Sequence, residues 1–190
     1  MSGGIIAQYM QGLITAMQNM DYDSVAKAVD VLWNAYNQNK QVFIFGNGGS
    51  ASTASHMACD IGKGVVREGK RRFRVQSLCD NVAIMTAWAN DVSYETMFKD
   101  QLENLLNPGD IVIAISASGN SPNVIKAVEF AKAQGALIIG MSGFDGGKLK
   151  DLSDVSIYFP VYDYGQVEDL HLMCEHAITQ CIRERMACSG

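Results

Sequence analysis

Hydrophobic positions along the chain alternate between short apolar runs and longer segments with helical spacing. The apolar runs, rich in β-branched and aromatic residues, predict buried strands at 42–45, 73–78, 110–115, 136–141 and 154–159. Helical spacing predicts helices at 4–20, 23–39, 50–62, 81–90, 95–106, 121–134 and 166–186, with a short turn near 147–152. This alternation predicts an α/β fold with a doubly wound, flavodoxin-like sheet of five parallel strands, flanked by helices.

The 190 residues fit a single domain with a full hydrophobic core. Within it, we expect residues 1–40 to form a helical pair and residues 41–190 to form the α/β core. Two helices ahead of the first strand are more than the sheet needs. We therefore expect them to cover the sheet or to pack against another subunit.

The turn after the first predicted strand is rich in glycine and ends in serine. In doubly wound sheets, ligands bind beyond the carboxyl ends of the strands, and glycines let backbone N–H groups approach them. A helix start then favours an anion or a polyhydroxyl compound. The turn residues that we expect to bind a substrate are Asn47, Gly48, Gly49 and Ser50.

Two further strand ends carry polar residues that are predicted to lie at the same edge of the sheet. Asp80 and Asn81 follow the second strand and are candidate substrate-binding residues. Ser116, Ser118 and Ser121 follow the third strand, and Pro122 marks a helix start. A well-capped helix would need only Ser121. Three hydroxyls at one helix N-terminus instead favour a binding site for the phosphate of a small molecule.

Ionisable side chains are concentrated on two of the predicted helices. His56 and Asp60 are four residues apart and share a helix face. Taken alone they would be a surface pair, but the neighbouring glycine turn favours an active site. The last helix carries a second ionisable group, consisting of Glu168, Asp169, His171, Glu175 and His176. A solvated face is the alternative for these charges, and His171, about 140° from His176 on the helix, is predicted to face packing or an interface.

Charge and cysteine usage exclude several classes of protein. The net charge of −5 argues against a nucleic-acid-binding surface, and the basic residues at 70–72 and 74 are predicted to form a solvated edge. Five scattered cysteines without a CxxC pair indicate a reducing compartment. No charged leader or long apolar run appears, so we expect a cytoplasmic protein without a membrane partner.

Gly46, Gly48 and Ala51 formally match the dinucleotide-binding fingerprint. The acidic residue expected about 20 positions later is missing, however, and such a site would not explain the serine loop. We therefore expect no nucleotide cofactor.

Together, these motifs resemble the sugar isomerase (SIS) domain family, and within it the phosphoheptose isomerases. The resemblance covers nearly the whole chain and is carried by GNGGSA at 46–51, HxxxD at 56–60, ISASGNSPNVIKA at 115–127, GFDGGKL at 143–149 and VEDLHLMCEHAI at 167–178. It implies a homotetramer with active sites at subunit contacts. It also implies isomerisation of sedoheptulose 7-phosphate to D-glycero-D-manno-heptose 7-phosphate through an enediol. The serine loop would hold the phosphate, and Asn47 and Ser50 would meet the sugar.

The resemblance further implies roles for the ionisable residues. Asp60 and His176 correspond to the acid–base pair of the family, and His56, Asp60, Glu168 and His176 correspond to the zinc ligands of some members. The family usually has Glu at position 60, Gln at 168 and Thr at 117, where this chain has Asp60, Glu168 and Ala117. The second carboxylate is expected to strengthen binding of one divalent metal, zinc, per chain. Glu168 is also a candidate substrate-binding residue.

Three alternatives remain open at the level of sequence. The chain could be a non-catalytic SIS module that binds a sugar phosphate or a protein partner, although His176 favours an enzyme. It could also isomerise another phosphorylated or sulfonated sugar. Finally, Glu168 could pair with His176 or point to solvent instead of binding a metal.

Overall fold

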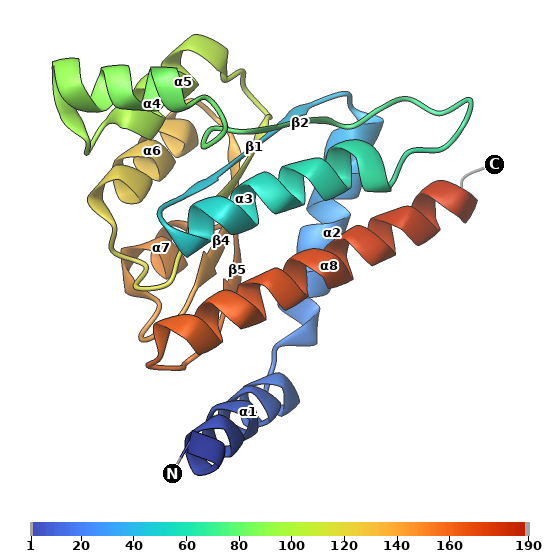
Figure 1. Ribbon diagram of the computed structural model, residues 1–190. Helices are drawn as coiled ribbons and strands as arrows, with labels where there is room; N and C mark the ends of the chain where they lie inside the picture. Colours follow the sequence, from blue (N-terminus) through green and yellow to red (C-terminus); the bar gives the residue numbers. More distant parts are fainter. Residues whose placement is uncertain (1, 189–190) are drawn as a thin grey trace.

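The computed structural model describes residues 2–188. Its centre is a five-stranded, all-parallel sheet with the strand order β2-β1-β3-β4-β5, which confirms the predicted doubly wound topology (Figure 1). The strands are β1 (Gln41–Gly46), β2 (Arg74–Ser77), β3 (Ile111–Ser116), β4 (Leu137–Ser142) and β5 (Val155–Tyr158).

Helices cover both faces of the sheet (Figure 1). The α-helices are α1 (Ser2–Gln18), α2 (Tyr22–Asn37), α3 (Gly49–Cys59), α4 (Val82–Trp88), α5 (Met97–Leu105), α6 (Pro122–Ala133), α7 (Gly147–Leu152) and α8 (Tyr164–Cys188). Helices α2, α3 and α8 pack on one face, whereas α5, α6 and α7 pack on the other. The sheet therefore forms the middle layer of three.

Alternating side chains of the central strands explain why both faces are covered. In β1, Val42 and Ile44 belong to the core beneath α2, α3 and α8. Phe43 and Phe45 belong to the core on the opposite face. Since all four side chains are at most 1% exposed, an unbroken apolar run is what this strand requires.

The strand order reverses direction between β1 and β3, and this switch point positions the candidate site. Gly46 pairs with Ile115 in the ladder, so the turns after these two strands begin side by side. Gly48 has a φ of 55° and caps α3, a conformation that glycine adopts without strain. The glycine turn and the serine loop consequently open onto the same crevice.

Two predicted helices differ from regular α-helix at their ends. Helix α3 passes at Asp60 into a π-helical segment, Asp60–Gly64, and α4 passes into a second one, Ala89–Ser93. Single π-helical turns of this kind are common at functional sites. Strand β2 is also shorter than predicted, because this edge strand pairs only with β1, over four residues.

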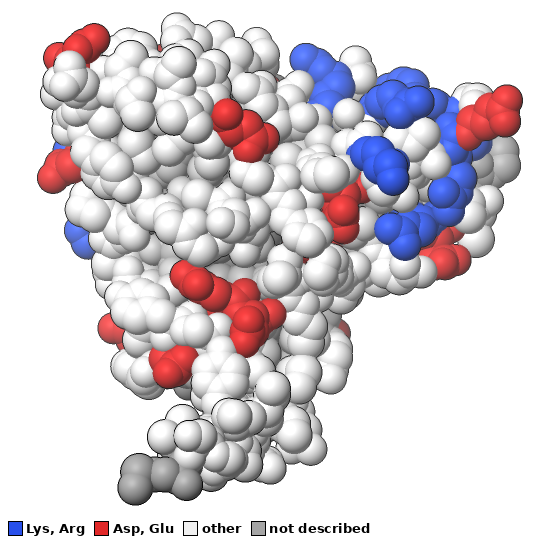
Figure 2. Space-filling view, in the orientation of Figure 1, with Lys and Arg blue, Asp and Glu red and all other residues white. Residues whose placement is uncertain are grey.

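Basic residues gather near the C-terminal ends of α3 and α8, as Figure 2 shows. Arg71 donates hydrogen bonds to the carbonyls of Tyr36 and Asn37, and Arg74 donates to the carbonyl of Asn39. These carbonyls lie at the C-terminal end of α2, where cations are favoured. We therefore assign these two arginines a structural role.

Helix α1 extends away from the body of the molecule and has no buried residues (Figure 1). Tyr9 of this helix contacts α8, because its hydroxyl donates a hydrogen bond to Asp169 over 2.6 Å. This carboxylate raises the pKa of Tyr9 to about 12. Within residues 2–188, no helix has both the length and the apolar character needed to span a bilayer.

Candidate active site

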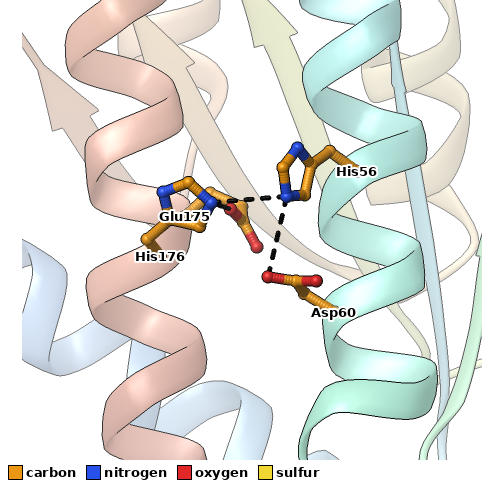
Figure 3. Close-up of side chains that lie close together, drawn as sticks. All are labelled: His56, Asp60, Glu175 and His176. Carbon is orange, nitrogen blue, oxygen red and sulfur yellow. Dashed lines mark hydrogen bonds and ion pairs between the residues drawn. The ribbon is translucent and has the colours of Figure 1, made fainter.

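Four ionisable side chains meet between α3 and α8 (Figure 3). His56 and Asp60 project from the end of α3, and Glu175 and His176 project from α8 toward them. The two imidazole Nε2 atoms lie 3.3 Å apart. His56 Nε2 is 3.7 Å from Asp60 Oδ2, and His176 Nε2 is 3.3 Å from Glu175 Oε2. One ligand atom from each residue lies within 4.8 Å of the other three, so this cluster could hold a metal ion.

The cluster is open to solvent on one side and closed on the other. The side chains of His56 and His176 are 45% and 51% exposed, whereas that of Glu175 is fully buried. Burial raises the pKa of Glu175, and the nearby Asp60 acts in the same direction. The hydroxyl of Thr179 donates a hydrogen bond to Glu175 Oε1 over 3.2 Å. A small molecule can therefore reach the two imidazoles, while Glu175 forms the floor of the cluster.

Glu175 was grouped with the ionisable residues of the last helix in the sequence, but no role was predicted for it. The signal lies in its spacing, because Glu175 falls four residues after His171 and three before Ile178. Both of these neighbours are buried, so all three side chains share the helix stripe that faces the sheet. A carboxylate on a buried stripe needs a partner.

The structure does not bring Glu168 into this cluster. Helices α3 and α8 run parallel and in register: Glu168 lies against Gly49, His176 meets His56, and Arg183 donates a hydrogen bond to the carbonyl of Gly64. A Cβ at Gly49 would collide with the Glu168 carboxylate. Seven residues of helix advance about 10.5 Å, so Glu168 lies about that far from the level of Glu175.

Glu168 instead lines a pocket of about 130 Å³ at the switch point. The residues around this pocket are Asn47, Ser50, Ile115, Ser116, Ala117, Ser118, Ser121, Tyr164 and Glu168. All three serines of the predicted phosphate loop are thus brought together with Asn47 and Ser50 of the glycine turn. Tyr164, the first residue of α8, was missed in the sequence because no motif marks it.

The serine hydroxyls do more than cap a helix. Ser121 is the N-cap residue of α6, yet its side chain makes no capping hydrogen bond. Its hydroxyl lies 3.0 Å from that of Ser116 instead. Ser118 Oγ accepts a hydrogen bond from the N–H of Asn120. The hydroxyls therefore face the pocket at the N-terminus of a twelve-residue helix, an arrangement suited to an anion.

Asn47 is held in place by two residues that the sequence did not single out. The side-chain amides of Asn47 and Asn123 exchange two hydrogen bonds of 2.9 Å. The hydroxyl of Tyr94 donates a third hydrogen bond to Asn47 Oδ1. Asn123 is buried, and its place in the SPN segment that opens α6 was the available signal.

Asp80 and Asn81 lie in a different groove, beside β2 and outside the serine pocket. Asp80 accepts a hydrogen bond from the hydroxyl of Ser55, and Asn81 Oδ1 caps α4 by accepting from the N–H of Ile84. Because β2 is the edge strand next to β1, its carboxyl end is one strand away from the switch point. Their predicted contact with substrate stays a prediction.

The chain is similar to known proteins that carry a SIS domain. A model of the SIS domain family matches residues 7–143. The phosphoheptose isomerase of Helicobacter pylori (strain P12) is 38% identical over 92% of this chain and 88% of the relative. That of Crocosphaera subtropica is 37% identical over 83% and 80%, respectively. The structure of phosphoheptose isomerase from Neisseria gonorrhoeae superposes with a TM-score of 0.86 over 96% of this chain and 97% of that chain, at 26% identity. This chain belongs to the phosphoheptose isomerase family of SIS domain proteins, which are aldose–ketose isomerases.

Proposed function

We propose that the protein converts sedoheptulose 7-phosphate into D-glycero-D-manno-heptose 7-phosphate, alongside the helix pair α3 and α8. The observation that carries the proposal is the placement of two sites along one parallel helix pair. The serine pocket lies at the level of Gly49 and Glu168, and the ionisable cluster lies at the level of His56 and Glu175.

The separation of the two levels suits a seven-carbon substrate. Seven helical residues span about 10.5 Å. Eight bonds join C1 of a heptose to the phosphorus at C7. At the advance of an extended chain, about 1.1–1.2 Å per bond, they cover about 9–10 Å. A phosphate in the serine pocket would therefore place C1 and C2 beside the ionisable cluster.

Isomerisation moves a proton between C1 and C2 through an enediol, and each proton needs a positioned group. We assign removal of the carbon-bound proton to Asp60, which extends from the junction of α3 with its π-helical segment. We assign proton transfer on the substrate oxygens to His176. Asn47, oriented by Asn123 and Tyr94, would hold a sugar hydroxyl. Binding of the remote phosphate would orient the reacting carbons.

The side chains of the ionisable cluster also fit a zinc ion. Two imidazoles and carboxylate oxygens form a donor set that zinc accepts, and one such atom from each residue lies within 4.8 Å of the others. When bound, the metal would stabilise negative charge on a substrate oxygen as a Lewis acid. His56, Asp60 and His176 would hold it.

The proposed reaction is tested by incubating the protein with sedoheptulose 7-phosphate in D₂O and following deuterium incorporation at C1 and C2 by NMR. We expect exchange and formation of the aldose, and both should be slower by about 100-fold or more in Asp60→Asn. A panel of shorter ketose phosphates and sulfonated sugars runs in parallel. Exchange only with another sugar would replace the substrate, and no exchange with any sugar, together with retained sugar phosphate binding, would indicate a non-catalytic binding protein.

We further propose that the protein assembles as a homotetramer and works in the cytoplasm. The exposed apolar residues of α1 support the first statement. All five cysteines are free thiols in the structure, which supports a reducing compartment.

A further inference from the structure

Tyr164, the first residue of α8, lines the serine pocket, and the proposed isomerisation does not use it. We propose that Tyr164 is a specificity-determining residue, which closes the end of this pocket that is farther from the ionisable cluster and makes the pocket select a phosphate monoester over a phosphodiester. The inference deepens the proposed function and rests on it for the presence of a phosphate in the serine pocket. It does not depend on whether the bound sugar is isomerised.

The position of Tyr164 along α8 places it behind the phosphate. Tyr164 lies four residues before Glu168, and both side chains line the pocket from one face of the helix. Four residues correspond to about 6 Å along the helix axis, in the direction away from His176. A sugar that extends from the pocket toward His176 therefore leaves its phosphate between the serine loop and Tyr164. A second substituent on the phosphate would have to pass the tyrosine ring.

The size of the pocket supports a single end group. Its volume is about 130 Å³. Sites that enclose a whole small molecule usually have about 300–1,000 Å³. The pocket can therefore take the terminal phosphate of a substrate, whereas the second arm of a phosphodiester would extend beyond it on the side that Tyr164 covers.

An aromatic neighbour holds the Tyr164 ring in place. The rings of Tyr164 and Phe144 meet edge to face with their centroids 4.8 Å apart, and Tyr162 meets Phe144 in the same way at 5.6 Å. Edge-to-face pairs at such distances attract each other. Since Tyr164 is 62% exposed, this contact and not burial defines where its ring stands. Within residues 2–188 its hydroxyl has no hydrogen-bond partner, so it can donate to a phosphate oxygen.

Phe144 itself has a strained backbone. Its φ of 51° lies in the left-handed region, which bulky residues rarely adopt. Its N–H donates a hydrogen bond to the carbonyl of Val161, and its carbonyl accepts one from the Tyr158 hydroxyl, each over 3.0 Å. Strained residues that the surrounding structure holds in this way are concentrated at ligand sites. The strain at Phe144 is thus consistent with a role in placing the neighbouring Tyr164 ring.

The segment that carries Phe144 is also bonded to the serine loop. The N–H of Gly143 donates to the carbonyl of Ala117 over 2.8 Å. The N–H of Lys148 donates to Asn120 Oδ1 over 3.1 Å. The aromatic rings are therefore fixed relative to the serine hydroxyls on the opposite side of the pocket. A wall at a set distance can reject a larger ligand by steric clash, which is one of the two routes to specificity.

Isothermal titration of the full-length protein with two probes tests this inference. The first is a heptitol 7-phosphate, which lacks the carbonyl group and cannot be isomerised, and the second is the methyl ester of its phosphate. We expect wild-type protein to bind the monoester more tightly. Tyr164→Ala should gain affinity for the methyl ester by about 10-fold or more, because the ring no longer obstructs the methyl group. A gain of binding is not what damage to the fold would produce.

Two further variants separate the ring from the hydroxyl and from the aromatic cluster. Tyr164→Phe keeps the ring, so it should still reject the methyl ester, and it should weaken binding of the monoester by about 10-fold through loss of a hydrogen bond to a charged group. Tyr162→Ala is the matched control, because Tyr162 contacts Phe144 but does not line the pocket, and it should change neither affinity. Thermal unfolding and light scattering show whether each variant keeps the fold and assembly of the wild type.

An absence of any gain for the methyl ester in Tyr164→Ala would overturn the inference. An equal gain in Tyr162→Ala, or a wild-type protein that binds both probes equally well, would overturn it too. Activity of the same samples distinguishes this failure from that of the proposed function. A protein that selects the monoester through Tyr164 but isomerises no sugar phosphate would retain the inference and remove the reaction. Isomerisation of heptose phosphate, together with rejection of the methyl ester by Tyr164→Ala, would do the reverse.

Discussion

His56 and His176 place their Nε2 atoms 3.3 Å apart, although 120 residues separate them in the chain. The contact results from two helices that lie side by side, each following a different part of the sheet. It brings the two candidate proton-transfer residues of the family, Asp60 and His176, to one level of the α3–α8 helix pair, and the serine pocket lies at another level of the same pair.

Asp60→Asn and His176→Asn should each lower kcat by about 100-fold or more, because each removes a group that must accept or donate a proton. Steady-state kinetics with heptose phosphate measure the effect, and circular dichroism checks folding. Asp60→Glu is the matched control, since it restores the longer carboxylate usual in the family, and should retain most of the activity. Near wild-type turnover in both Asn variants would remove the acid–base assignment.

Ser118→Ala and Ser121→Ala should each weaken binding of the sugar phosphate by about 10-fold or more, because hydrogen bonds to a charged group are strong. Thr86→Ala is a control on exposed α4, where the hydroxyl bonds only to carbonyls of its own helix. Isothermal titration gives the affinities. The serine loop would not be a phosphate site if wild-type protein bound the dephosphorylated sugar equally well.

Metal removal should abolish activity, and added zinc should restore it. Protein purified without chelators should contain about one divalent metal per chain by elemental analysis, because the cluster provides a complete set of donor atoms. Substoichiometric metal together with full activity in a strong chelator would contradict the metal site.

The apolar residues of α1 predict assembly. Ile6, Met10 and Ile14 are 60%, 53% and 42% exposed and recur every four residues, so they form one stripe on this helix. We expect a tetramer in light scattering at micromolar concentration. The double variant Ile6→Lys with Met10→Lys should dissociate it, whereas Gln8→Lys, exposed on the opposite face of α1, should not. A monomeric wild-type protein would show that the stripe is not an interface.

His171 should make the fold sensitive to acid. It is 1% exposed, and burial lowers its pKa to about 4. Below about pH 6.5, the unfolded chain protonates this residue while the folded chain does not. The free energy of unfolding should therefore decrease as pH falls from about 6.5 to 4, by up to about 1.4 kcal/mol per pH unit. Denaturant unfolding at pH 6 and 5 measures this slope. The His171→Leu variant should have a smaller slope, and an equal slope would exclude His171 as its source.

The strand and helix content could be read from the sequence because it depends on local pattern. The apolar run 42–45 predicted a strand covered on both faces, and the structure buries Val42 and Phe43 on opposite sides. Likewise, Ser121-Pro122 predicted the start of α6, which begins at Pro122. The predicted end of the helix at 50–62 was less accurate, because the α-helix becomes π-helical at Asp60. Repeating patterns define the type of an element, whereas its end depends on local contacts.

The grouping of the site residues was decided by tertiary structure. Glu168 and Glu175 are seven residues apart and point in nearly the same direction from α8, so helical geometry alone does not distinguish them. The register of α8 against α3 places Glu168 at Gly49 and leaves Glu175 in contact with His176 and near His56. The sequence by itself determined which residue types were available and which helices carry them. Only the packing of the two helices decided which carboxylate meets the imidazoles, because a side chain's partner depends on the neighbouring element at its own level.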